Sequence, residues 1–155
     1  MKKILSVILG CTLIFSLVGC SSMVSKNKEV LTADSFKSHF EGVEDYAVAD
    51  FTYQCEGMPI KTALAADDKI DGYGIEFYIC EDNASAQNFY NENLEIFSQF
   101  AKEPVITEGE NYQKFTGSGS LNYWSLTRVD NTVLLCDTVK QHQIEVEAIV
   151  TALGY

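Results

Sequence analysis

Two kinds of hydrophobic periodicity alternate along the chain after residue 30. Stretches with an apolar side chain at every second position predict β-strands, and stretches with apolar side chains three or four positions apart predict helices. The predicted strands are 46–53, 60–66, 73–80, 111–116, 121–129 and 132–139. The predicted helices are 33–41, 84–101 and 140–153. The chain is therefore predicted to follow the order α-βββ-α-βββ-α.

Short polar segments separate these elements and indicate how the strands pair. Thr32 is suited to cap the first helix, Asp82 and Asn83 are the candidate caps of the second, and Pro104 ends the second one. Segments 117–120 and 130–131 are short enough to join neighbouring strands as hairpins, which makes those strands antiparallel. The sequence therefore predicts an α+β fold, with an antiparallel sheet of about six strands and with helices packed on one face of it.

The first twenty residues have the pattern of a secretory signal peptide. Lys2 and Lys3 precede an apolar run over 4–18. The tetrapeptide 17–20, Leu-Val-Gly-Cys, resembles the lipobox of bacterial lipoproteins. That resemblance implies cleavage before Cys20 and acylation of its thiol. An uncleaved membrane helix is less compatible with the run, because a bilayer crossing needs about 20 apolar residues; plain secretion is the other alternative.

Three regions follow from this interpretation. Residues 1–19 are a lipoprotein signal peptide, and residues 20–30 are the lipidated cysteine and a flexible tether, since that segment is short and polar. Residues 31–155 form a single α+β domain, because a chain of this length suits one hydrophobic core.

The charge of the chain restricts its partners. The formal net charge is −11, and loss of Lys2 and Lys3 with the signal peptide brings it to −13. So acidic a domain is repelled by nucleic acid and by anionic lipid headgroups. We therefore expect no nucleic-acid partner, and we expect the acyl chains on Cys20 to be the only membrane attachment. The expected location is the outer face of the cell membrane, where the partner is an extracytoplasmic protein or a small ligand.

Three cysteines remain in the predicted domain, at Cys55, Cys80 and Cys136. Three thiols allow at most one disulfide, and the two that each end a predicted strand, Cys80 and Cys136, are the candidates for it. The alternative is that all three behave as small buried hydrophobic residues. No C-x-x-C motif occurs, which gives a thioredoxin-like role little support.

The candidate binding residues lie on two predicted strands. Arg128, the only arginine, points to the same side of its strand as Trp124, and Glu76 and Tyr78 share a side of another strand. If the two strands face one concavity, the four residues line a pocket suited to a carboxylate, a sulfate or a sugar. The alternative is an exposed ion pair between Arg128 and Glu76, which would contribute little to stability.

The sequence does not match the motifs by which metal and cofactor sites are recognised. The acidic segment 67–72 places Lys69 and Tyr78 where a calcium-binding EF-hand loop needs oxygen ligands. The only histidines, His39 and His142, have no metal-ligand spacing with cysteine or carboxylate. The sequence therefore predicts no metal site and no cofactor, and it shows neither a phosphate-binding glycine loop nor a nucleophile elbow.

The segments 76–78, 128–132 and 153–155, which read Glu-Phe-Tyr, Arg-Val-Asp-Asn-Thr and Leu-Gly-Tyr, resemble small uncharacterised lipoproteins of Gram-positive bacteria. The resemblance implies an exported lipoprotein domain and brings no catalytic residues with it. We therefore expect a membrane-anchored extracytoplasmic lipoprotein that acts by binding a ligand or a protein. Two alternatives remain: an enzyme whose site on the sheet uses Glu76 and Arg128, and a thiol-based role of Cys80 and Cys136.

Overall fold

A computed structural model describes residues 26–155 of the chain. The predicted signal peptide, Cys20 and the first part of the predicted tether lie outside the described residues.

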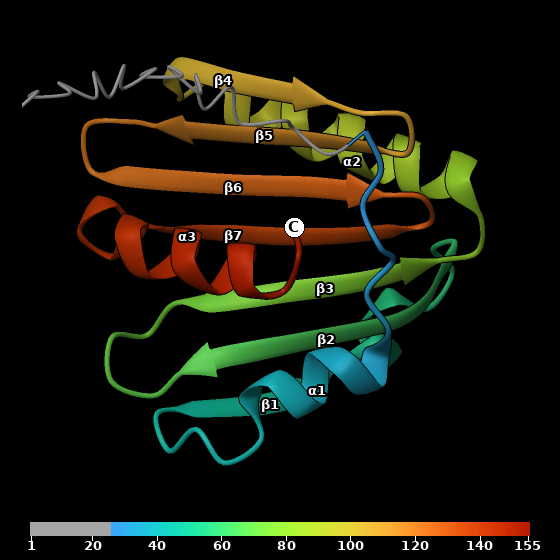
Figure 1. The fold of residues 1–155 in the computed structure, drawn as a ribbon, viewed down its shortest axis with the longest axis horizontal. Helices are drawn as coiled ribbons and strands as arrows, with labels where there is room; N and C mark the ends of the chain where they lie inside the picture. The colour runs from blue at the N-terminus through green and yellow to red at the C-terminus, as the bar shows by residue number, and fades with distance from the viewer. Residues whose placement is uncertain (1–25) are drawn as a thin grey trace, which may run out of the picture.

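The centre of the molecule is one antiparallel sheet of seven strands (Figure 1). Their order across the sheet is β1-β2-β3-β7-β6-β5-β4. The pairing of β3 with β7 therefore joins the strands that precede α2 in the chain to those that follow it. The bounds are β1 Tyr46–Asp50, β2 Ile60–Asp68, β3 Gly74–Cys80, β4 Lys102–Glu108, β5 Tyr112–Ser118, β6 Asn122–Val129 and β7 Thr132–Val139. The α+β class and the antiparallel pairing are as predicted.

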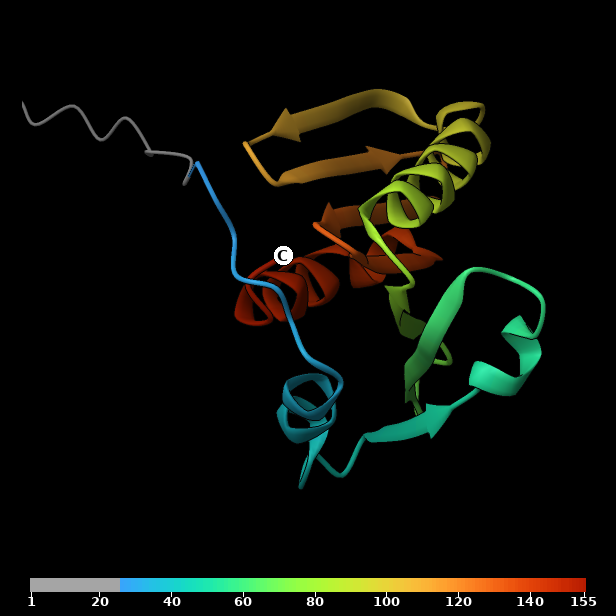
Figure 2. The same ribbon diagram turned by 90° about the vertical axis from the view of Figure 1, so that its right-hand side faces the viewer.

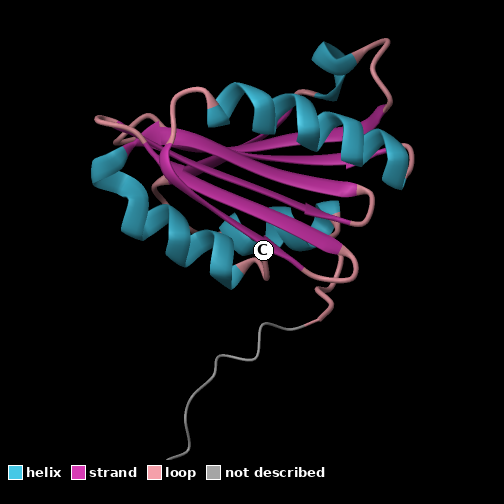
Figure 3. Cartoon of the chain, turned by 90° about the horizontal axis from the view of Figure 1, so that it is seen from above, coloured by secondary structure: helices cyan, strands magenta, loops and turns pink. Residues whose placement is uncertain are grey.

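Helices cover both faces of the sheet, which corrects the prediction that they pack on one face. Helices α1 (Ala33–Phe40) and α3 (Gln143–Ala152) lie on one face, and α2 (Asn83–Ser98) lies on the other (Figure 1 and Figure 3). Two short 3₁₀ turns, η1 (Thr52–Cys55) and η2 (Lys140–His142), complete the elements of residues 26–155.

The sheet needs helices on both faces because inner strands such as β3 and β6 carry apolar side chains on both. In β3, Phe77 packs with Phe36 of α1 in one core, whereas its neighbour Tyr78 packs with Phe89 of α2 in the other. The residues of β3 are all buried or partly buried, as is typical of a strand in a sheet enclosed by helices. We refer below to the α1/α3 face and the α2 face.

A second correction concerns the number of strands: the sheet has seven, and β4 is the one that the sequence pattern does not predict. Pro104, which the sequence pattern places at the end of the preceding helix, lies in this edge strand, where a residue without an N–H group is tolerated. The pairing of β4 with β5 shifts between Lys102 and Val105, and Glu103 there has a positive φ of 53°. This irregularity and the exposure of most of β4 remove the alternating pattern by which strands are recognised.

Local side-chain bonds set where the elements begin and end. Thr32 Oγ1 accepts a hydrogen bond from the Ser35 amide at 3.1 Å, and Asp82 Oδ1 accepts one from the Ser85 amide at 2.8 Å, so both predicted caps are confirmed. The first strand stops at Asp50, three residues before its predicted end, and the chain turns into η1. The predicted last helix starts as η2 and becomes α-helical only after His142.

The N-terminal part of the described chain is held against the domain. Asn111 exchanges two hydrogen bonds of 2.9 Å with the backbone of Lys28, whose Nζ donates to the Gly154 carbonyl at 2.7 Å. The Leu31 amide donates to the hydroxyl of Tyr155 at 3.2 Å. Figure 2 shows this segment passing beside the end of α3 before it enters α1. The last five residues of the predicted tether, 26–30, are therefore docked.

Candidate functional site

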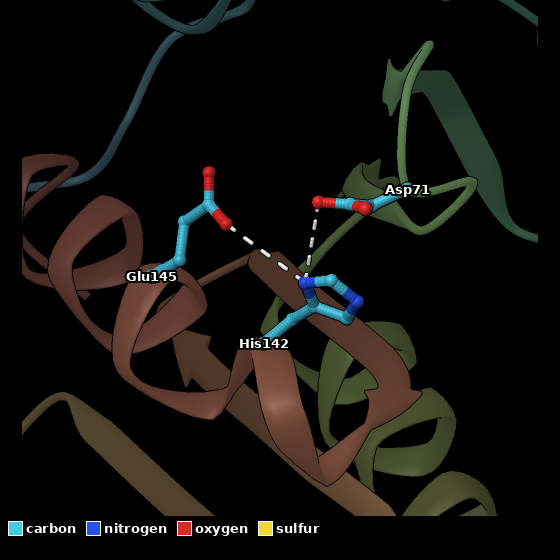
Figure 4. A group of neighbouring side chains, drawn as sticks. All are labelled: Asp71, His142 and Glu145. Atoms are coloured by element: carbon cyan, nitrogen blue, oxygen red, sulfur yellow. Dashed lines mark ion pairs between the residues drawn. The ribbon is translucent and has the colours of Figure 1, made fainter.

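Three ligand-type side chains meet at one end of the α1/α3 face. Asp71 comes from the turn between β2 and β3, and His142 and Glu145 come from the start of α3 (Figure 4). His142 Nδ1 lies 3.5 Å from Asp71 Oδ2 and 4.0 Å from Glu145 Oε2. One ligand atom from each of the three side chains lies within 4.8 Å of the other two. We call Asp71, His142 and Glu145 the turn–helix cluster.

The turn that carries Asp71 is fixed by its own backbone and by Asp68. The buried Asp68 carboxylate accepts hydrogen bonds from the Ile70 amide at 2.8 Å and the Asp71 amide at 2.5 Å. Gly72 has a φ of +72°, a left-handed conformation that costs glycine little. The turn therefore projects the Asp71 carboxylate, while its backbone donors are already satisfied.

His142 is held by contacts on both sides of its ring. The residue is 8% exposed, and the ring lies against Tyr73, with 5.2 Å between centroids and 31° between planes. Its Nε2 is 2.7 Å from the side-chain Nε2 of Gln141. Because His142 is the N-cap residue of α3, Glu145 three positions later lies on the same side of the first helical turn.

The surroundings of the cluster keep the phenol of Tyr73 neutral. Burial raises the pKa of Tyr73 far above its ordinary value, and its hydrogen bond with the Tyr46 hydroxyl and the nearby Glu145 charge act in the same direction. Tyr73 is therefore a neutral hydrogen-bonding neighbour. Asp71 also lines an open cleft of about 290 Å³ together with Asn122 and Asp137, so a small ion or ligand can reach the Asp71 side of the cluster.

This arrangement supports two chemistries. A neutral imidazole presents the lone pair of Nδ1 to a cation that the two carboxylates also bind. A protonated imidazole instead forms ion pairs with Asp71 and Glu145.

The four candidate residues from the sequence, Glu76, Tyr78, Trp124 and Arg128, all lie on the α2 face; we call them the sheet-face set. The Tyr78 hydroxyl donates a hydrogen bond to Glu76 Oε2. Trp124 is 6% exposed and stacks on Phe97 of α2, with 6.1 Å between ring centroids. Side chains of α2 therefore fill much of the space that the predicted pocket requires.

Arg128 is separated from Glu76 by strand β7. In the cross-strand register, Val133 of β7 lies between Arg128 and Tyr78. The Arg128 Nη1 donates to the Asp130 carbonyl at 3.1 Å, and no ion pair joins Arg128 to Glu76 among residues 26–155. The structure thus brings Glu76 and Tyr78 together and leaves Arg128 apart from Glu76.

The cysteines of the described part of the chain are free and buried. Cys80 packs in the core of the α2 face and Cys136 in the core of the α1/α3 face, so the sheet lies between them and they are not bonded. Burial raises the pKa of Cys80 to about 11 and that of Cys136 to about 12. Both thiols are therefore protonated and weakly nucleophilic near neutral pH.

Sequence reasoning missed the turn–helix cluster because it looked for ligands at short spacing. Asp71 and His142 are far apart in the chain and meet only when the β2–β3 turn reaches the start of α3. One local signal was present, namely His142 and Glu145 three residues apart where a helix was expected to begin.

Comparisons with protein families, with curated proteins and with solved structures found no match to this chain. Among the described residues, no helix is long and apolar enough to cross a membrane.

Proposed function

We propose that this protein is a lipoprotein anchored through Cys20 to the outer face of the cell membrane, and that its domain binds a small ligand or a partner protein there. The observation that carries the proposal is the lipobox-like tetrapeptide 17–20, which follows the charged and apolar segments of a signal peptide. The Lys26 carbonyl already accepts a hydrogen bond of 2.7 Å from the Glu110 amide. Six peptide steps separate Cys20 from Lys26, and a fully extended chain of that length spans about 20 Å.

Such a short connection would hold a particular side of the domain near the membrane. Glu110 lies in the loop between β4 and β5, and Asn111 in the same loop binds the backbone of Lys28. The β4–β5 loop therefore faces the lipid in this proposal. Since the mature chain would carry a charge of −13, acyl chains rather than electrostatic attraction would retain it there.

The binding function is supported by open concave surfaces on the domain. One is a groove of about 640 Å³ between α1 and the edge strand β1, a volume within the range typical of ligand sites. Its lining combines apolar and charged side chains, from Phe40, Tyr46 and Val48 to Asp34, Lys37 and Glu41. The cleft beside Asp71 is another.

The anchor is tested by changing cysteines. Cys20→Ala should abolish incorporation of a labelled fatty acid and release the protein from the membrane fraction after a high-salt wash. The matched control is Cys11→Ala, in the apolar run that is removed, and it should leave both readouts unchanged. Firm membrane retention of the Cys20→Ala protein would contradict the proposal.

A further inference from the structure

We propose that Asp71, His142 and Glu145 form a binding site for a divalent transition-metal ion of the zinc type. The inference names a ligand class for the binding function proposed above, and it does not depend on the lipid anchor. It rests on the spacing of three donor atoms, on their chemistry and on the residues that fix them.

The separation of the donors fits an ion placed between them. The 3.5 Å from His142 Nδ1 to Asp71 Oδ2 exceeds the usual hydrogen-bond range. Two ligand atoms that each lie 2.0–2.1 Å from a tetrahedral ion are about 3.4 Å apart. The His142–Asp71 pair already has this separation. The Glu145 oxygen, 4.0 Å from Nδ1, reaches it through a small rotation of a side chain that is half exposed.

The donor set selects the class of metal. One imidazole nitrogen with two carboxylates suits zinc and neighbouring transition metals, whereas Mg²⁺ and Ca²⁺ prefer oxygen ligands alone. Three protein ligands leave at least one coordination position open. That position would be reached from the cleft that Asp71 shares with Asn122 and Asp137.

Neighbouring residues fix the donors as metal sites require. The Gln141 amide nitrogen faces His142 Nε2 in the structure, and rotation of this amide would let its oxygen accept from the Nε2–H of His142 and leave Nδ1 free to bind the ion. Tyr73 packs on the ring and limits its rotation, and Asp68 holds the turn that presents Asp71. The contacts of Tyr73 and Asp68 are in place without any ion.

Charge also favours a cation at this position. Asp71 and Glu145 bring two negative charges close to one another on a chain whose net charge is already −11. With a neutral imidazole, a divalent ion compensates both carboxylates. The competing arrangement is a protonated His142 that pairs with them and binds no metal.

The test is a zinc titration of the full chain, purified in mild detergent and stripped with a chelator. We expect one zinc ion per chain by calorimetry, and a Tm increase of roughly 5–10 °C at zinc 100-fold above the dissociation constant. Asp71→Asn and Glu145→Gln should each lower the affinity by about 100-fold or more, because loss of a residue that only supports a ligand already costs 10–100-fold. His39→Gln, which changes the only other histidine, is the matched control and should bind as the unchanged chain does.

Two further measurements keep the result decisive. Co²⁺ in place of zinc should give d–d absorption bands that Asp71→Asn abolishes, and excess Mg²⁺ or Ca²⁺ should not displace it. Because His142 is buried, His142→Gln is interpreted only if the variant keeps the circular-dichroism spectrum of the parent. Absence of zinc binding, or equal binding by Asp71→Asn and the parent, overturns the metal site and leaves the ion-pair arrangement. Failure of the Cys20→Ala experiment would not affect this outcome.

Discussion

The sheet-face set and the turn–helix cluster differ in how well their positions in the sequence predict whether they form an accessible site. The members of the sheet-face set share a face by strand periodicity, yet α2 covers that face and β7 separates Arg128 from Glu76. Asp71 shares no periodicity with His142 and Glu145 of the turn–helix cluster, yet the donor atoms of the three lie within 4.8 Å of one another beside an open cleft. Periodicity indicates the side of a strand on which a residue lies, but what covers that side is decided by the tertiary fold.

The sharpest test of this contrast is Trp124→Ala. If Trp124 is a core residue beneath α2, its removal should lower the free energy of unfolding by about 3–5 kcal/mol, as truncation of large buried aromatic side chains does. Urea denaturation measures the change. Leu121→Ala, at a nearby residue that is 75% exposed, should change it by less than about 0.5 kcal/mol. Equal effects of the two variants would mean that Trp124 is not part of the core.

The next largest effect is expected from Tyr78→Phe. The phenol donates to the partly buried Glu76 carboxylate, so its loss leaves that acceptor without this partner and should cost about 1–3 kcal/mol of unfolding free energy. Tyr90→Phe is the matched control on the same face, because the Tyr90 hydroxyl is buried without a hydrogen-bond partner. That variant should be neutral or stabilising, and a similar loss in both would contradict the assigned role of the Tyr78–Glu76 bond.

The stability that α2, the helix covering the sheet-face set, gives the protein should depend on pH through its N-cap residue Asp82. The hydrogen bonds from Ser85 hold the pKa of Asp82 below its ordinary value of 3.8. Because the pKa of Asp82 is lower in the folded than in the unfolded chain, the ionised carboxylate stabilises the folded protein at every pH above the ordinary pKa. This stabilisation is lost as the pH falls through the lower pKa of the folded state. The stability advantage over Asp82→Ala should therefore shrink between pH 7 and the acid limb of the unfolding curve.

Chemical denaturation at a series of pH values measures that advantage. Asp82→Asn keeps a capping oxygen but has no titratable proton, so it should retain the cap without this pH dependence. An advantage of the parent over Asp82→Ala that stays constant with pH would refute the assignment.

The smallest effect is predicted for Asp71→Asn in the absence of metal. The Asp71 side chain is 43% exposed, and exposed ion pairs contribute little, so the unfolding free energy should fall by no more than about 1 kcal/mol. Thermal or urea unfolding in the presence of a chelator provides the value. A much larger loss would mean that the turn–helix cluster stabilises the fold, as the sheet-face set does.

Much of the fold could be predicted because most strands lie inside the sheet. Thr132–Val139 has the bounds that its sequence predicts, and the caps at Thr32 and Asp82 are where their residue types place them. The edge strand β4 could not be found, because exposure and a bulge remove its alternation. The second helical layer could not be predicted, because in the sequence Tyr78 shares a side of its strand with the charged Glu76, whereas in the structure Tyr78 and Cys80 belong to a second apolar core.

The candidate site was harder to predict than the fold. A side chain such as Asp71 looks like any acidic turn residue until the partner helix is placed beside it. Only the pair His142 and Glu145 could have been recognised locally, and two ligands do not define a metal site.

The docked segment 26–30 has a mechanical consequence. A force that pulls on the chain from its N-terminal side, as movement of an anchored protein would, reaches Asn111 and Gly154 through Lys28 before it reaches α1. Tyr155 carries part of the same load, since its hydroxyl binds both the Leu31 amide and Thr132 of β7. Tension is thus shared between the β4–β5 loop, the last turn of the chain and the middle of the sheet, and the first helix is shielded from it.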